Sequence, residues 1–399
     1  MVKIKKIKGR QVFDSRGNPT VEAEIFSDKG NYASAIVPSG ASTGTYEAFE
    51  LRDKENKNYL GKSVFKAVEN INSSISKALK NIDIHNQKKI DKILTDLDGT
   101  EQKKKLGANA ILAVSMASCK LGAIESNTSL FQYLGNSKNY QLPIPMLNII
   151  NGGVHAKNNL DIQEFMIRPD KVNSFSEAMR RSFLVIQNLK GMVDTTNVGD
   201  EGGFAPNLKN TEKAIEVIIK AIEKSGFKPG EDISICLDVA ANELNESKTI
   251  DYYSKLIKNY PIKSIEDPFP EDDWESWKNL TNNTNIQIVG DDLFATNLKR
   301  LKKGIEEKSA NAILVKLNQI GTVTETLDVV NLAQKNNFKT IISHRSGDTE
   351  DTFIADLAVA TKSSQIKTGS LARSERVAKY NRLLRIEEEL GKDAKIGKV

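Results

Sequence analysis

The chain has 399 residues, with 57 Lys and Arg against 52 Asp and Glu, and two cysteines. This length allows two domains, one of them large. The small excess of positive charge is spread over interspersed Lys and Glu, which argues against a nucleic-acid-binding surface. Cys119 and Cys236 lie far apart and form no CxxC motif, a pattern typical of a protein in a reducing compartment.

Hydropathy argues against a membrane or secretory location. No apolar run of the sequence approaches the length of a membrane span. Residues 1–9 contain no apolar core of signal-peptide length. We therefore expect a cytoplasmic protein with no membrane partner.

The first third of the chain predicts strands followed by helices. Residues 20–26 alternate apolar and polar side chains, as in a half-buried antiparallel strand, and residues 32–37 are its expected partner. Residues 63–79, 90–97 and 107–124 have the apolar spacing of helices. This order indicates an α+β domain, which we place at residues 1–136.

Residues 38–44 form a loop of small side chains with two glycines. Such a loop allows its backbone to come close to a ligand. A plain surface loop is the simpler interpretation. An active-site lid, with hydroxyl groups that reach a phosphate or a metal ion, is the alternative.

A second domain is predicted at residues 137–399, and it opens with a strand at 146–150. The next predicted strand, 163–167, has its polar residues at its start, which indicates that it runs opposite to the later strands. His155 and the glycine-rich loop 199–206, with Glu201, are further candidates for function. Taken singly, each of them could equally be structural.

Six short apolar runs between residues 233 and 369 each stop at a polar residue, at intervals of about 25 residues. A strand, a crossover helix and two loops need about that many residues. Repeated strand–helix alternation implies a parallel sheet and, at this number of repeats, a closed (β/α)8-type barrel. The polar stops are Asp238, Glu266, Asp291, Lys316, the His344-Arg345-Ser346 run and Lys367.

Catalytic side chains of such barrels lie at the carboxyl ends of the strands, where all these stops fall. A single Asp after a strand is more often a turn residue or a helix cap. Six charged or reactive residues on one rim of the barrel are better explained as an active site. The adjacent carboxylates Asp238, Glu266 and Asp291 would repel one another without a cation, and all-oxygen ligands favour Mg²⁺ over Ca²⁺ or Zn²⁺. The cationic stops that follow indicate a small anionic substrate.

Seven motifs, taken in order, resemble those of the enolase family. They are residues 39–44, 199–206, 264–268, 290–293, 316–321, 343–347 and 367–369. The resemblance covers about residues 10–391. It implies an α+β capping domain and a ββαα(βα)6 barrel with one antiparallel strand. It also implies the conversion of 2-phosphoglycerate to phosphoenolpyruvate, and at least a homodimer, with an octamer as the larger assembly.

The resemblance also implies the metal ligands and the substrate contacts. Asp238, Glu266 and Asp291 match the ligands of a tightly held Mg²⁺, and Ser42 matches a lid serine that joins a second Mg²⁺. Substrate contacts fall on Ser42 and on Gln163, Arg345, Ser346 and Lys367. Of these, Arg345 and Ser346 match the phosphate grip and Lys367 the contact to the substrate carboxylate.

The catalytic roles follow in the same way. Lys316 matches the base that removes the proton from C2. Glu201 matches the acid that assists loss of the C3 hydroxyl, with Glu164 beside it. His155 matches a histidine that closes over the substrate, and His344 is a further catalytic candidate.

Two alternatives remain at this point. Another Mg²⁺-dependent enzyme of the same superfamily, such as a racemase or a cycloisomerase, would share the three carboxylates. It would not be expected to combine them with Ser42, Glu201 and the Arg345 grip. A surface adhesin role, with a cell-surface or secreted pool, could coexist with catalysis. The ending Gly397-Lys398-Val399 lacks the terminal lysine often tied to such adhesion.

Overall fold

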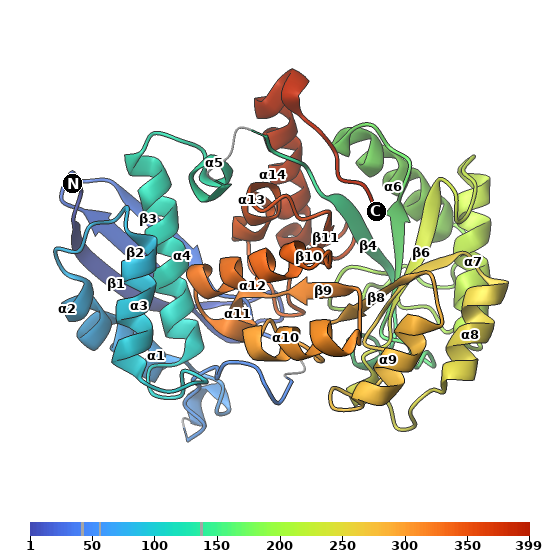
Figure 1. Cartoon of the computed structure of the whole chain (residues 1–399), viewed down its shortest axis with the longest axis horizontal. Coiled ribbons are helices and arrows are strands. Elements are labelled where there is room, and N and C mark those ends of the chain that lie inside the picture. Colours follow the sequence, from blue (N-terminus) through green and yellow to red (C-terminus); the bar gives the residue numbers. More distant parts are fainter. Residues whose placement is uncertain (41–43, 56, 136–138) are drawn as a thin grey trace.

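The computed structural model describes residues 1–40, 44–55, 57–135 and 139–399. A three-stranded sheet with its helices lies on one side of the molecule, and a closed eight-stranded barrel ringed by helices lies on the other (Figure 1). The domain boundary predicted between residues 136 and 137 falls outside the described residues and stays a prediction. Ser42 also lies outside them.

The N-terminal sheet is antiparallel, in the order β1-β2-β3, with β1 Ile4–Phe13, β2 Pro19–Ser27 and β3 Tyr32–Ile36. β2 and β3 match the predicted segments 20–26 and 32–37. The helices that follow are α1 Phe65–Asn70, a π-helical turn Ile71–Ile75, α2 Ser76–Leu79, α3 Gln87–Asp98, α4 Ala108–Glu125 and α5 Leu130–Gly135. α4 is buried on almost every side, as its apolar composition requires, and packs on β2 and β3.

The barrel closes in the order β10-β11-β4-β5-β6-β7-β8-β9. β5 is antiparallel to both neighbours and the remaining pairs are parallel, which confirms the predicted barrel type with its one reversed strand. The strands are β4 Ile144–Asn151, β5 Glu164–Pro169, β6 Ile233–Asp238, β7 Ile262–Glu266, β8 Gln287–Gly290, β9 Ala312–Val315, β10 Lys339–Ser343 and β11 Gln365–Lys367.

Amphipathic helices cover the outside of the barrel. Several begin at a side chain that caps the free backbone N–H groups of the first turn, such as Asn210 before α7, Asp273 before α9 and Thr322 before α12. The helices are α6 Phe175–Lys190, α7 Thr211–Lys224, α8 Ile250–Asn259, α9 Trp274–Asn282, α10 Leu298–Glu307, α11 Leu317–Ile320, α12 Val323–Lys335, α13 Phe353–Ala360 and α14 Ser374–Leu390. Short 3₁₀ turns occur at Lys57–Tyr59, Gly153–His155, Ala241–Glu243 and Gly391–Asp393.

An apolar layer fills the barrel interior, with seven side chains contributed by six of its strands. Its members are Met146, Met166, Cys236, Val289, Ala312, Leu314 and Ile341. The barrel is therefore a packed core with no pore, and polar side chains can gather only at its two ends. No helix in the described part of the chain is long and apolar enough to cross a membrane.

Candidate active site

The carboxyl ends of the barrel strands converge on one narrow cavity of about 30 Å³. Each predicted stop lies at or directly after the last residue of its strand. The described candidates that line the cavity are His155, Gln163, Glu164, Glu201, Asp238, Asp291, Lys316, His344, Arg345, Ser346 and Lys367. Glu266 does not line the cavity, but it contacts Lys367, which does.

Lys367 lies at the centre of the anionic side of this cavity. Its Nζ is 2.8 Å from Asp238 Oδ2 and 2.8 Å from Glu266 Oε1. Glu164 Oε1 is 3.2 Å away. Burial alone would lower the pKa of Lys367, but the surrounding carboxylates raise it well above its ordinary value. Its ammonium group is therefore a fixed positive charge.

Lys316 makes the second ammonium–carboxylate contact of the site. Its Nζ lies 2.5 Å from Asp291 Oδ2, and both groups are buried. Burial favours the neutral amine, but the Asp291 carboxylate outweighs it and raises the pKa of Lys316. Gln319 donates to the other Asp291 oxygen at 2.9 Å. Lys316 is thus protonated until Asp291 takes another cationic partner.

The three predicted metal ligands fit a hard divalent cation by their chemistry. Asp238, Glu266 and Asp291 are all buried, and each already faces a positively charged head group, Lys367 or Lys316. Buried carboxylates that hold ammonium groups here are the oxygen donors that Mg²⁺ prefers.

Two groups of three ionisable side chains in the described residues have ligand atoms within 4.8 Å of one another, and neither is the predicted trio. One is Asp267, Asp291 and Asp292. Both Asp267 oxygens accept backbone N–H groups, from Asp291 at 2.9 Å and from Asp292 at 2.8 Å, so Asp267 shapes the turn after β8. The other group, His155, Glu164 and Glu201, lies on the predicted acid side of the cavity.

Glu201 is surrounded by hydrogen-bonding groups. Its Oε1 lies 3.3 Å from His344 Nε2 and 3.8 Å from His155 Nδ1, and its Oε2 accepts from Asn148 at 3.1 Å. Burial acts to raise the pKa of Glu201, but His344 and His155 outweigh it and hold the pKa well below the ordinary value. Burial and the nearby Glu201 charge raise the pKa of Glu164 well above it. The pKa values of the two acids are therefore shifted in opposite directions.

Several buried polar atoms of the cavity have no hydrogen-bond partner among the described residues. They include His155 Nδ1, Gln163 Oε1 and Glu164 Oε2. An unpaired buried donor or acceptor costs about 1–3 kcal/mol. Polar atoms left in this state, next to fixed positive charges, indicate a site built to receive a polar, anionic ligand.

Arg345 is held by the N-terminal part of the chain. Its guanidinium bonds both Glu47 oxygens, at 2.7 Å and 3.2 Å, and also Asn318 Oδ1 at 3.1 Å. Ser39 pairs with Gly347 through the backbone, which brings the start of loop 38–44 beside Arg345 and Ser346. The N-terminal region thus completes the barrel site.

Sequence reasoning missed the residues that hold the candidates in place. Glu47, Asn148, Asp267 and Arg376 are buried at or behind the cavity, and only Asp267 lies in a motif that marks it. Asp267 could have been found, because it directly follows Glu266 within a recognised motif. The other three lie far in sequence from the groups they contact.

Comparisons with known proteins agree with this geometry. A family model described as the enolase C-terminal TIM barrel domain matches residues 139–250 and 242–398, and one for the enolase N-terminal domain matches residues 4–134. An enolase of Pelagibacter ubique (strain HTCC1062) is 62% identical over 418 residues, an alignment that covers 100% of both chains. The chain belongs to the enolase family.

Proposed function

We propose that this chain is a phosphopyruvate hydratase, a lyase that reversibly dehydrates 2-phospho-D-glycerate to phosphoenolpyruvate in glycolysis and gluconeogenesis. The observation that carries the proposal is the cavity in which the Lys316 amine, the Glu164–Glu201 pair and the carboxylates of Asp238 and Asp291 meet, with Glu266 in contact through Lys367. Removal of a proton next to a carboxylate needs a base and strong positive charge around that carboxylate. This cavity offers both.

Substrate binding falls to the cationic and polar rim. Arg345 and Ser346 grip the phosphate, since a guanidinium matches phosphate oxygens with paired donors. Lys367 contacts the substrate carboxylate, and Gln163 has a free acceptor oxygen for a substrate hydroxyl. Ser42 stays a predicted contact of the loop.

Two Mg²⁺ ions are part of the proposal, one held by Asp238, Glu266 and Asp291, the other joined by Ser42. When bound, they supply positive charge that neutralises the charge built up on the substrate carboxylate. If Asp291 served as a metal ligand, Lys316 would lose the ion pair that keeps it protonated and its amine could accept the C2 proton.

The acid step uses the carboxylate pair. Glu201 is the group proposed to deliver a proton to the departing C3 hydroxyl. Its neighbours hold the pKa of Glu201 below its ordinary value, whereas burial and the Glu201 charge raise that of Glu164, so Glu164 is the member of the pair that keeps a proton more readily. His155 closes the cavity over the substrate, and His344 faces Glu201.

The test is to add 2-phosphoglycerate with and without Mg²⁺ and to follow the ultraviolet absorbance of phosphoenolpyruvate. Product formation that requires both substrate and metal supports the proposal. Absence of product with both present would refute the proposal.

Light scattering at micromolar concentration tests the proposed homodimer or octamer, which a stable monomer would contradict. A cytoplasmic site of action, with any cell-surface pool, also stays a proposal.

A further inference from the structure

Arg376 lies completely buried behind the cavity, near the start of α14. Its Nη1 is 2.5 Å from His344 Nδ1 and donates to the Arg345 carbonyl at 2.6 Å. Its Nη2 donates to the Ser346 carbonyl at 2.7 Å and to the Asp200 carbonyl at 3.1 Å. One guanidinium thus joins the strand end that carries His344 to the loop that carries Glu201.

The chemistry of this contact decides where the imidazole proton lies. A guanidinium only donates hydrogen bonds and stays protonated in proteins. His344 Nδ1 must therefore accept, so it carries a lone pair and no proton. In a neutral imidazole the other nitrogen then carries the hydrogen. That nitrogen, Nε2, is the one that lies 3.3 Å from Glu201 Oε1.

The surroundings also favour a neutral ring. Burial lowers the pKa of His344 to about 4; Glu201 and Asp348 oppose the shift, and Arg376 reinforces it. A protonated ring would have to place an N–H on Nδ1 against the N–H of Arg376, which is the wrong pairing of two donors. Glu375 and Asp348 lie 3.3 Å and 3.8 Å from Arg376 and balance its buried charge.

We propose that Arg376 is a positioning residue, which holds His344 as the neutral tautomer with its N–H on Nε2, the nitrogen that lies 3.3 Å from Glu201 but makes no aligned hydrogen bond among the described residues. Both Glu201 oxygens then face donors, His344 at Oε1 and Asn148 at Oε2. Two donors facing its two oxygens favour the carboxylate form of Glu201. The effect on turnover rests on the proposed function, whereas the tautomer itself does not.

The decisive measurement is nitrogen NMR of the whole protein labelled with ¹⁵N-histidine, without substrate or metal. The chain has three histidines, so His85→Gln and His155→Gln identify the His344 signals by elimination. We expect a neutral ring protonated at Nε2 throughout pH 6–8. A ring protonated at Nδ1, or an imidazolium at pH 7, would overturn the proposal, and no Arg376 variant is needed for that result.

Variants then test the cause. In Arg376→Met, Nδ1 loses its donor, and we expect His344 to populate the Nδ1–H form or to titrate above pH 5. Arg376→Lys keeps a charged donor and should retain the Nε2–H form. Arg373→Lys is the matched control, since Arg373 starts the same helix but bonds the Ser15 carbonyl and Glu375. An unchanged His344 signal in folded Arg376→Met would show that Arg376 does not set the tautomer.

Turnover of the same variants links the tautomer to catalysis. Arg376→Met should lower kcat by about 10²-fold, the cost of a misplaced catalytic group, with a smaller change in KM. Arg376→Lys should recover part of that loss. If the wild type shows the expected tautomer but no hydratase activity, the proposed function fails and the positioning role stands. If the wild type is active but shows the opposite tautomer, the positioning role fails and the proposed function stands.

Discussion

Both ends of the barrel bury charged side chains, and the two ends differ in how these are paired. At the amino end, Arg168 donates to Gln365 at 3.0 Å and lies 2.6 Å from Asp170. Gln365 in turn donates a hydrogen bond to Gln287 at 2.7 Å, and Gln287 donates one to Ser264 at 2.9 Å. The chain of hydrogen bonds crosses the barrel with its charges matched.

At the carboxyl end, the charges are concentrated and the partners incomplete. Lys367 lies among three carboxylates, and polar atoms of Gln163 and Glu164 have no partner in the described residues. The apolar layer around Met166 and Cys236 separates the two ends. The difference indicates that a closed hydrogen-bond network stabilises the barrel, whereas an open one marks the end where a ligand completes it.

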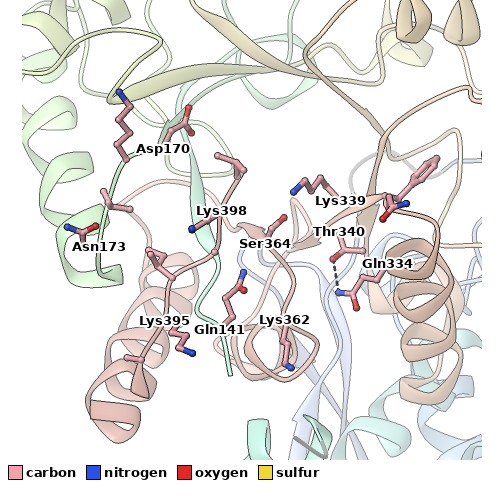
Figure 2. Close-up of a pocket in the computed structure, with 18 residues that line it drawn as sticks. Gln141, Asp170, Asn173, Gln334, Lys339, Thr340, Lys362, Ser364, Lys395 and Lys398 are labelled. Atoms are coloured by element: carbon pink, nitrogen blue, oxygen red, sulfur yellow. Dashed lines mark hydrogen bonds between the residues drawn. The ribbon is translucent and has the colours of Figure 1, made fainter. Parts of the chain in front are cut away.

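Cavity volume alone would point to the amino end of the barrel as the ligand-binding end. A hollow of about 1330 Å³ lies outside the amino end, against about 30 Å³ for the candidate active site. The labelled Lys339, Lys362 and Lys398 border this hollow (Figure 2), and their exposed side chains contact no acid of the described chain. Exposed lysines remain hydrated and perturb one another little. Burial and mutual contact of the charges, and not volume, distinguish the active end.

Metal removal should have the largest effect, and only at the carboxyl end. Exhaustive EDTA treatment should abolish turnover, because the three carboxylates cannot by themselves stabilise a carboxylate of rising negative charge. Added Mg²⁺ should restore it. Circular dichroism should stay unchanged, since the amino-end network contains no metal ligand. Full turnover after chelation would exclude the metal assignment.

Lys316→Ala and Glu201→Gln should fail at different steps, each with a loss of about 10²–10⁴-fold in turnover. Without Lys316 there is no base, so exchange of the C2 proton with heavy water should also stop. Glu201→Gln should still exchange that proton while making little phosphoenolpyruvate. Proton NMR of 2-phosphoglycerate in heavy water with Mg²⁺ measures both. Exchange by Lys316→Ala but not by Glu201→Gln would mean that acid and base are reversed.

Arg168→Met should destabilise the fold at the other end. It leaves the half-buried Asp170 without its ion-pair partner and removes the contact to Gln365, so we expect a loss of about 1–3 kcal/mol of unfolding free energy. Turnover per folded molecule should stay near the wild-type value, since Arg168 does not line the active cavity. Urea unfolding of Arg168→Met and of Lys316→Ala measures the unfolding free energy that each variant loses. Equal stability losses in the two variants would contradict the contrast between the ends.

Acid should weaken the carboxyl end through His344. Its pKa is about 4 in the folded protein and near 6.5 in the unfolded chain, so the unfolded state binds more protons between these values. Stability should therefore fall as the pH drops from 7 towards 4. Urea unfolding at pH 7 and pH 5 should show about 2 kcal/mol more loss for wild type than for His344→Gln. An equal loss in both would show that His344 does not titrate this way.

The smallest effect is expected in the lysine hollow. Lys339→Gln removes an exposed charge that no acid contacts, so stability should change by less than about 0.5 kcal/mol. Turnover should not change. A tenfold fall in turnover would show that the two ends are coupled.

Most of the barrel could be predicted because its signal is local. The period of the strand–helix unit sets where each strand ends, so Asp238, Glu266 and Asp291 could be placed on one rim by sequence alone. The reversed direction of β5 followed from the polar start of its strand, Gln163-Glu164.

Only the tertiary structure decided which distant groups hold these candidates. Glu47 reaches Arg345 across 298 residues, and Asn148 reaches Glu201 across 53. Arg376 follows no strand and reads in sequence as one more basic residue of an amphipathic helix. Periodicity determines which way a side chain faces its own element. The partner it meets there depends on how whole elements pack, and no local pattern of residues encodes that.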